Sequence, residues 1–536
     1  MKKLKLVCVA IAMASAAPTF AGGLLTNTNQ HVAFNRMMSR EASIGIDGVY
    51  YNPAGVVFMG DGKHLAINWQ LAYQTRTINN DYSLFTNNVN NPITPRDFKG
   101  KAFAPVIPSF QYAYNKGKWS FQANFALTGG GGKCTFDDGL GSFEKIVSET
   151  AIAACGLAGV VDQTLGNKLG QPGMEMFTSD QAFGKTGKYS FNSYMHGRQY
   201  YYGLSAGAAY KFCDNFSAFL GVRGVYALTN YYGYVENINV GNMPLYKVLD
   251  PTKENAANIE LSCDQTGVGF TPIIGVDYKT GRWNFSAKYE FKTRIRLKNK
   301  SVNQTPSIGN LPANLANQMT GILTARYQQA GLPLEQAKQQ AENTTNAVLN
   351  DPTVGATMMG LKTQFDQKLN KAIGEYEDGK KIAGDIPGYL ALGIGYSPVD
   401  AVRVNVGFHW FDDKNATSYN NRNKELKRGT LEYNAGVEVD VNKKITLSTG
   451  WQNTNYGLSD EYMDDKSFVV GSNSAAIGGV YHINKKMDLN VAYFHTFYQH
   501  KKTSETVQLA ADNSIVYNSD YTRNNNVFAV GLDINF

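Results

Sequence analysis

Beyond its N-terminal end, the 536-residue chain lacks long apolar runs. No segment after residue 22 supplies the roughly 20 consecutive apolar residues that a membrane-spanning helix needs. The mean hydropathy of −0.32 is compatible with a secreted soluble protein. It is equally compatible with a membrane β-barrel, because a barrel carries its lipid-facing side chains at every second position. The absence therefore disfavours a helical membrane protein and leaves the choice to the strand pattern.

Charge and cysteine are also scarce. The formal net charge is +7 and is dispersed along the chain, which does not favour a nucleic-acid partner. Four of the five cysteines lie beyond the N-terminal end: Cys134, Cys155, Cys213 and Cys263. No CxxC or Cys/His spacing typical of a metal site occurs, so we expect neither a metal nor a cofactor. In an oxidising compartment these cysteines would form loop disulfides or remain free thiols.

The N-terminal end has the sequence MKKLKLVCVAIAMASAAPTFAG. It combines a basic start at Lys2, Lys3 and Lys5 with an apolar run and with small residues toward Ala21. These features predict a secretory signal over residues 1–21, so that the mature chain starts near Gly22. A transmembrane helix is the alternative, but the apolar run is shorter than a span requires.

Tyrosine, phenylalanine and glycine are abundant, with 32, 28 and 53 residues, which is typical of sheets with many turns. At the C-terminus, NVFAVGLDINF alternates apolar and polar residues, as a strand with one apolar face does. The same alternation recurs along the chain. It predicts fourteen strands, near 64–74, 103–114, 118–128, 199–211, 215–229, 264–279, 282–297, 386–397, 401–412, 428–441, 444–455, 473–483, 487–499 and 525–536.

The connections between these strands alternate in length. Those after even-numbered strands are short, such as NKGK and KTGR, and those after odd-numbered strands are long. Short turns at one rim and long loops at the other are typical of an outer-membrane barrel. We therefore expect an all-β fold: a fourteen-stranded antiparallel transmembrane β-barrel over residues 63–536, in the outer membrane of a Gram-negative bacterium. A soluble β-sandwich is the alternative, but it would not alternate its connection lengths.

Two of the long connections carry apolar residues at helical spacing. They predict helical insertions at about 135–170 and 310–380, on the outward side of the barrel. Their apolar stripes include Leu157, Val161, Leu361, Phe365 and Leu369. Such stripes serve loop-to-loop packing or form an apolar docking surface for a ligand, and both interpretations stay open.

Residues 22–62 precede the first strand and lack alternation. Because a fourteen-stranded barrel has a lumen wider than its own wall side chains fill, we expect this segment to plug the lumen as a hatch. Its stretch VYYNPAG contains a proline, which fixes φ and removes a donor, and two small residues that permit close packing. We predict that Asn52, Pro53, Ala54 and Gly55 lie inside the lumen near the third strand and act in gating.

SIGIDGVYYNPAG, followed directly by a strand, resembles the hatch and NPA triplet of the FadL/TodX-type outer-membrane transporters of long-chain fatty acids and other hydrophobic compounds. DIPGYLALGIGYSP and MDLNVAYFHTF add to the resemblance, which spans nearly the whole mature chain. It implies a monomer in which an outer groove between loops catches a hydrophobic ligand. The ligand then moves to a lumenal site and leaves sideways at a kink in the third strand. Here that strand ends in Gly129, Gly130, Gly131 and Gly132, which are candidates for such a gap or for a loop hinge.

A fatty-acid carboxylate would need a basic donor in an otherwise apolar site. Strand parity places Arg223, Arg294 and Arg296 on the lumenal face, although large barrels have polar lumens in any case. The resemblance adds Arg428, at the start of the tenth strand, as the preferred partner for the headgroup.

The cysteines allow one local disulfide. Cys134 and Cys155 lie within the same long connection, where a bridge would staple the first helical insertion. Cys213 falls in a short turn at the opposite rim and is not expected to pair with them.

These observations predict passive uptake of hydrophobic small molecules, foremost long-chain fatty acids, by a barrel that contacts outer-membrane lipid. A lipid-modifying barrel enzyme and a general diffusion porin are the alternatives. We expect no catalytic residue, because His409 and His495 are isolated and no GxSxG motif occurs. The long segment ahead of the first strand disfavours an open porin.

Overall fold

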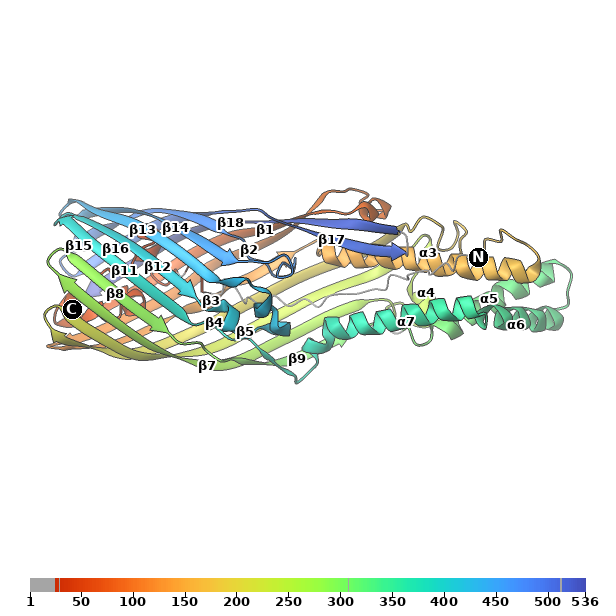
Figure 1. The fold of residues 1–536 in the computed structure, drawn as a ribbon, viewed down its shortest axis with the longest axis horizontal. Coiled ribbons are helices and arrows are strands. Elements are labelled where there is room, and N and C mark those ends of the chain that lie inside the picture. Colours follow the sequence, from red (N-terminus) through yellow and green to blue (C-terminus); the bar gives the residue numbers. More distant parts are fainter. Residues whose placement is uncertain (1–24, 28, 307, 511–512) are drawn as a thin grey trace.

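The strands of the molecule close into one antiparallel barrel (Figure 1). The computed structural model describes residues 25–27, 29–306, 308–510 and 513–536, and the predicted signal over 1–21 lies outside them. β1 (Gly62–Asp81) pairs on one side with β2 (Arg96–Lys116) and on the other with β18 (Asn513–Asn535). This closure matters in lipid, because the hydrocarbon offers no partner to an unpaired strand edge.

Fourteen strands form the wall, as predicted. Between β2 and β18 they are β3 (Trp119–Phe136), β4 (Tyr189–Cys213), β5 (Phe216–Val240), β7 (Ile259–Thr280), β8 (Trp283–Glu290), β11 (Tyr389–Val399), β12 (Val402–Phe411), β13 (Arg428–Asn442), β14 (Ile445–Gly457), β15 (Ser472–Asn484) and β16 (Met487–Tyr498). Four shorter strands extend the wall at its outer end: β6 (Met243–Pro244), β9 (Arg296–Gln304), β10 (Lys381–Ala383) and β17 (Lys501–Ala510).

The wall has an apolar outer face and a polar inner face at membrane depth. In β7, Val268 and Phe270 are 59% and 69% exposed, whereas Thr271 and Asp277 are buried on the lumenal side. The alternation in the sequence therefore corresponds to side chains that point in turn to the outer and the inner face of the barrel. Several strands continue beyond the predicted ends, because outside the lipid the outward side chains need not be apolar while the backbone ladder persists.

The two rims differ as predicted. Tight turns join β2 to β3 and β7 to β8, at Gly117 (φ +61°) and Gly281 (φ +55°), where the positive φ favours glycine. All the long connections lie at the other rim, from which a group of helices extends (Figure 1).

One strand departs from the predicted parity. β8 ends at Glu290 and β9 starts at Arg296, and between their pairings with β7 six residues (267–272) face seven (291–297). The extra residue reverses which side chains point inward. Arg294 and Arg296 are consequently exposed, while Ile295 is fully buried. The prediction that these two arginines face the lumen is wrong for this reason.

Both predicted helical insertions are present. The helices of the outer end are α3 (Gly141–Leu169), α4 (Tyr246–Leu249), α5 (Leu311–Gln329), α6 (Leu334–Leu349) and α7 (Pro352–Ile373). Shorter 3-10 helices are η1 (Gly55–Met59), η2 (Ser83–Asn87), η3 (Gly374–Tyr376), η4 (Asp413–Asn415) and η5 (Tyr419–Glu425). By length and composition α3 is apolar enough to cross a membrane, contrary to the expectation that no such segment follows residue 22. It packs instead against β4, β5, α6 and α7.

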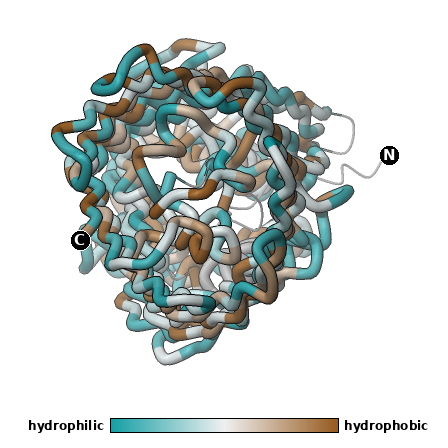
Figure 2. The backbone as a smooth tube through the Cα atoms, turned by 90° about the vertical axis from the view of Figure 1, so that its left-hand side faces the viewer, coloured by the Kyte–Doolittle hydropathy of each residue, from teal (hydrophilic) through white to brown (hydrophobic). Residues whose placement is uncertain are grey.

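The N-terminal segment fills the lumen as predicted, and we call its described part up to Asp61 the hatch. Figure 2 looks into the short-turn end, where the wall surrounds this chain. α1 (Val32–Met37) is wholly buried and contacts β13 to β16, and α2 (Gly48–Tyr51) contacts β2 and β3. A side chain at Gly436 or Gly450 of the wall would collide with the carbonyl oxygen of Met37. Room for the hatch thus comes largely from glycines of the wall.

Candidate functional site

An apolar groove lies between the helices at the outer end, and we call it the outer groove. Its cavity of about 100 Å³ is lined by Thr150, Ala153, Ala154, Leu157, Ala158, Val161, Phe177, Phe183, Leu245, Val248, Leu249, Ile308, Leu311, Leu315 and Leu361. All of these are apolar apart from Thr150. The predicted residues Leu157, Val161 and Leu361 therefore meet in one groove, whereas the side chains of Phe365 and Leu369 lie outside the described ones.

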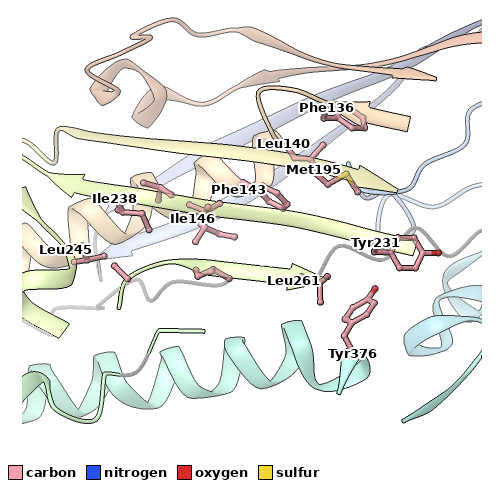
Figure 3. Close-up of a cluster of buried hydrophobic side chains, with 14 of the residues drawn as sticks. Phe136, Leu140, Phe143, Ile146, Met195, Tyr231, Ile238, Leu245, Leu261 and Tyr376 are labelled. Carbon is pink, nitrogen blue, oxygen red and sulfur yellow. The ribbon is translucent and has the colours of Figure 1, made fainter. Parts of the chain in front are cut away.

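The outer groove continues inward as a column of buried apolar side chains. Leu245 of the groove belongs to the same cluster as Phe136 and Tyr376. Figure 3 shows Tyr376 next to Tyr231 of β5, with ring centroids 6.3 Å apart. The ring centroids of Tyr376 and Tyr419 lie 5.5 Å apart. Apolar side chains are thus packed continuously from the loop helices toward the lumen.

A second and larger cavity lies in the lumen between the hatch and the wall, and we call it the lumenal cavity. Its volume is about 410 Å³. It is lined by Thr26, Asn27, Asn29 and Gln30 of the hatch, by Gln70, Ala72, Gln74 and Arg76 of β1, by residues 102–109 of β2, by Ala126, Leu127, Gly130 and Gly132 of β3, and by Tyr200, Tyr456, Phe494, Tyr498, Arg523, Asn525 and Val527. Polar and apolar groups contribute comparably, unlike in the outer groove.

The wall is interrupted where this cavity meets β2 and β3. The ladder between these strands runs to Ser109↔Ala126 and resumes only at Ala102↔Cys134. Residues 103–108 of β2 and 127–133 of β3 are unpaired with each other, and we call this stretch the lateral gap. At about 3.3 Å per residue, its β2 edge is about 20 Å long. The glycines predicted as gap candidates, 129–132, all lie within it.

The sequence explains why the ladder opens here. Pro105 and Pro108 of β2 have no backbone N–H to donate. On the facing edge, Gly130 and Gly132 have φ of +94° and +76°, and the pairing of β3 with β4 shifts register twice between Leu127 and Gly132. Proline on one edge and left-handed glycine on the other therefore prevent a regular ladder. The two prolines are visible in the sequence and mark the interruption as well as the glycines do.

Gln30 of the hatch spans the lateral gap from the inside. Its side-chain amide donates to the Leu127 carbonyl oxygen at 2.6 Å. Its own carbonyl oxygen accepts from Ser109 Oγ at 2.7 Å and from Gln111 Nε2 at 2.9 Å. One hatch residue is thus bonded to both strands that border the gap. No sequence motif indicated Gln30.

The NPA triplet lies inside the lumen beside β3, at the position predicted for it. Asn52 Nδ2 donates to Asp277 Oδ2 of β7 at 2.6 Å, and its Oδ1 accepts from the Gly55 amide at 3.1 Å. The carbonyl oxygens of Pro53 and Ala54 accept from Gln122 and Ser217, each at 2.7 Å. These bonds fasten the hatch to β3, β5 and β7 on the short-turn side of the lateral gap.

The remaining headgroup candidates do not line the lumenal cavity. Arg223 is buried as predicted, but both of its terminal nitrogens are bound to Glu290, at 2.6 and 2.9 Å. Arg428 is exposed at the outer rim and donates to Asn455. As predicted ligand contacts, neither is positioned to meet a molecule in the cavity. Arg296 is bound to Asp385 at 2.8 Å on the outside of the strand.

Two other arginines do line the lumenal cavity, Arg76 and Arg523. They are cross-strand partners in the ladder between β1 and β18. Gln74 Oε1 accepts from Nη2 of Arg523 at 2.7 Å and from Nε of Arg76 at 3.3 Å. Both lie beyond the predicted strands, since the first was expected to end at 74 and the last to begin at 525. Continuing the alternation past those ends would have found them.

The predicted Cys134–Cys155 disulfide is absent, since the four cysteines of the described chain are free thiols. Cys134 lies in β3, opposite Ala102, rather than in a loop. Cys155 lies on α3, where its thiol donates to the Phe183 carbonyl oxygen at 3.4 Å. The continuation of β3 to Phe136 separates the two residues.

His409 joins the hatch to the wall. Its Nε2 lies 2.7 Å from Glu41 of the hatch and its Nδ1 lies 2.9 Å from Glu432 of β13, with all three side chains buried. The prediction that this histidine is isolated is therefore wrong. The arrangement is a buried polar contact between hatch and wall, in which a carboxylate lies at each ring nitrogen of the imidazole.

A closed fourteen-stranded barrel, plugged by its own N-terminal segment and open between two wall strands, has the fold of the FadL/TodX-type channels. Among solved structures, the chain resembles a FadL homologue from Pseudomonas aeruginosa, with a TM-score of 0.57 and 14% identity, covering 96% of this chain and 100% of that one. It also resembles a variant of the monoaromatic hydrocarbon channel TodX, with a TM-score of 0.50 and 13% identity, covering 95% and 100%. The predicted resemblance is thus confirmed for the fold.

No protein-family model matches the chain, and no curated protein matches it in a sequence comparison.

Proposed function

We propose that the protein takes up hydrophobic small molecules passively across the outer membrane of a Gram-negative bacterium, with long-chain fatty acids as the foremost substrates. The outer groove captures the molecule, which then moves along the column of buried apolar side chains into the lumen. Rearrangement of the hatch near Gln30 then opens the lateral gap, through which the molecule passes into the membrane. All parts of this route belong to one chain, so the protein works as a monomer surrounded by lipid.

One observation carries this proposal: the lumenal cavity reaches the wall where the ladder between β2 and β3 is interrupted. In the same stretch, Phe103 and Val106 line the cavity and are also 57% and 61% exposed, so apolar side chains are accessible at the interruption. An apolar solute leaving here passes from a protein cavity directly into hydrocarbon. It therefore avoids the unfavourable transfer through water.

The two other functions fit the geometry less well. A general diffusion porin needs a continuous aqueous channel, whereas the hatch fills the lumen and is bonded to the wall at Gln30, Glu41 and Asn52. A steady conductance of the wild-type protein in planar bilayers would favour the porin. A lipid-modifying enzyme needs a nucleophile next to a base, but both ring nitrogens of His409 are turned toward carboxylates. We therefore propose a transport function without catalysis.

A reversible cross-link across the lateral gap tests the route. A Cβ placed on Gly132 would lie 3.7 Å from that of Ala104, within the range that a disulfide spans. The variant Ala104→Cys/Gly132→Cys is made in a Cys134→Ser background, which removes the neighbouring thiol. Because Gly132 has positive φ, its replacement introduces strain of about 1–2 kcal/mol, so the Gly132→Cys single variant is the matched control.

Uptake of radiolabelled oleate is measured in a bacterial host that lacks its own fatty-acid channel. We expect the oxidised double variant to lose uptake and dithiothreitol to restore it, while both single variants respond to neither treatment. Equal uptake by the oxidised and reduced double variant would overturn exit through the gap.

A further inference from the structure

The cross-strand pairs between β1 and β18 change in character along the lumenal cavity. From the outer side inward they are Arg76↔Arg523, Gln74↔Asn525 and Ala72↔Val527, and all six residues line the cavity. The row thus passes from cationic to neutral polar to apolar within three successive pairs on one face. A ligand lying along this row meets charge at one end and hydrocarbon at the other.

The cationic pair is an unusual arrangement for a wall. Like charges directly opposite on one face of a sheet destabilise it. Nε of Arg523 is buried and has no hydrogen-bond partner among the described residues. The guanidinium also lies over the ring of Tyr498, 5.2 Å from its centroid, which limits its movement. An anion between the two arginines would relieve their repulsion and accept from donors that are already oriented.

The pair lies just outward of the lateral gap. Arg76 pairs with Gly100 of β2, one level beyond the Ala102↔Cys134 pair that closes the gap on its outer side. Ala72 pairs with Ala104, which borders the gap itself. At about 3.3 Å per residue, the two levels are about 13 Å apart along the strand. A molecule moving inward therefore reaches the arginines before it reaches the opening.

We infer that Arg76 and Arg523 form a binding site for the acid group of an amphipathic carboxylate, whose apolar tail lies along Ala72 and Val527 toward the lateral gap. The inference rests on the proposed function and adds to it a binding site for the acid group and an orientation of the ligand. The two planar guanidinium groups suit the two oxygens of a carboxylate. The ligand then leaves the gap tail first, and an uncharged molecule of the same length lacks the interaction that arrests it at this level.

The test compares two probes with the same ten-carbon chain, decanoate and decanol. Binding to the full-length protein in amphipol is measured by calorimetry for the wild type and for Arg76→Gln/Arg523→Gln. We expect the wild type to bind decanoate more tightly than decanol. Because hydrogen bonds to charged groups are lost, the double variant should bind decanoate about 10-fold or more weakly, with decanol binding unchanged. Arg428→Gln, at the exposed rim, is the matched control and should bind both probes as the wild type does.

Wild-type affinity of the double variant for decanoate would overturn the inference. So would a wild type that binds decanol but not decanoate, a result that leaves the uptake function intact. A wild type that binds neither probe would overturn both proposals. If the double variant binds neither probe, the variant Arg76→Lys/Arg523→Lys distinguishes a lost site from a damaged fold, because lysine keeps the positive charge. Recovery of decanoate binding would support the site, and its continued absence would overturn it.

Discussion

The side-chain amide of Gln30 donates a hydrogen bond to the carbonyl oxygen of Leu127, 2.6 Å away, at an edge of the lateral gap that no ladder partner occupies. A backbone carbonyl that β2 would bond in a regular sheet is bonded by the hatch instead. The plug thus replaces part of the missing ladder, so that movement of the plug and opening of the wall are coupled.

Gln30→Ala should open the lateral gap more readily. The substitution removes the bond to Leu127 and keeps the Gln30 carbonyl that Ser109 and Gln111 use. We expect faster hydrogen exchange in residues 127–133 and a small rise in bilayer conductance. Gln122→Ala is the matched control, because it removes a hatch contact at Pro53, away from the gap. Equal exchange in both variants would contradict a gating role for Gln30.

Asn52→Ala should loosen the hatch at its anchor. The change removes the 2.6 Å bond to Asp277 and leaves a buried carboxylate with one donor fewer. Losing a partner of a buried polar group costs about 1–3 kcal/mol. We expect a lower unfolding temperature and protease sensitivity of the hatch in the purified protein. Asp277→Asn added to Asn52→Ala should recover part of the stability by removing the charge, and no recovery would contradict the explanation.

Polar substitution in the outer groove should weaken capture of an apolar substrate. Leu157→Asn and Leu361→Asn each remove an apolar side chain from the lining, and burying a leucine contributes about 1.5–3 kcal/mol. We expect half-maximal oleate uptake at a concentration roughly 10-fold higher, with the maximal rate unchanged. Leu334→Asn, at an exposed site on α6, is the control. The same shift in all three variants would argue against a specific groove.

The outer rim should be more stable in acid. Burial raises the pKa of Asp413 in η4 to about 7, although its carboxylate accepts from the Thr430 amide at 2.9 Å. Between about pH 4 and 7, Asp413 therefore keeps its proton while the rim is folded and loses it when the rim unfolds locally. Stability is highest in acid and falls as pH rises through this window.

Hydrogen exchange at Thr430, corrected for intrinsic rates, tests this pH dependence. Protection should be greater at pH 5 than at pH 8 in the wild type. It should vary little in Asp413→Asn, which keeps an oxygen to accept the Thr430 amide bond. Greater protection at pH 8 in the wild type would contradict the assignment.

Much of the fold could be predicted because it depends on local patterns. Alternation of apolar and polar residues, as in 525–536, predicted the fourteen strands. The contrast of short and long connections predicted the two different rims. The helical spacing of apolar residues that include Leu157 and Leu361 likewise predicted the loop helices. The prediction that Arg294 and Arg296 face the lumen was wrong, because one extra residue between β8 and β9 reverses which side chains point inward. An irregularity of that kind depends on how the neighbouring strand β7 pairs.

The sequence by itself determined the barrel and its plug, since lipid requires an apolar residue at every second position and a closed ladder. It also placed Asn52 to Gly55 in the lumen and marked the third strand by its glycines. Only the tertiary structure decided which side chains meet: Gln30 with Leu127, Arg76 with Arg523, and Glu41 with His409. These partners are far apart in the chain or lie beyond the expected strand ends. Strand register and the docking of the hatch, rather than any local pattern, bring them together.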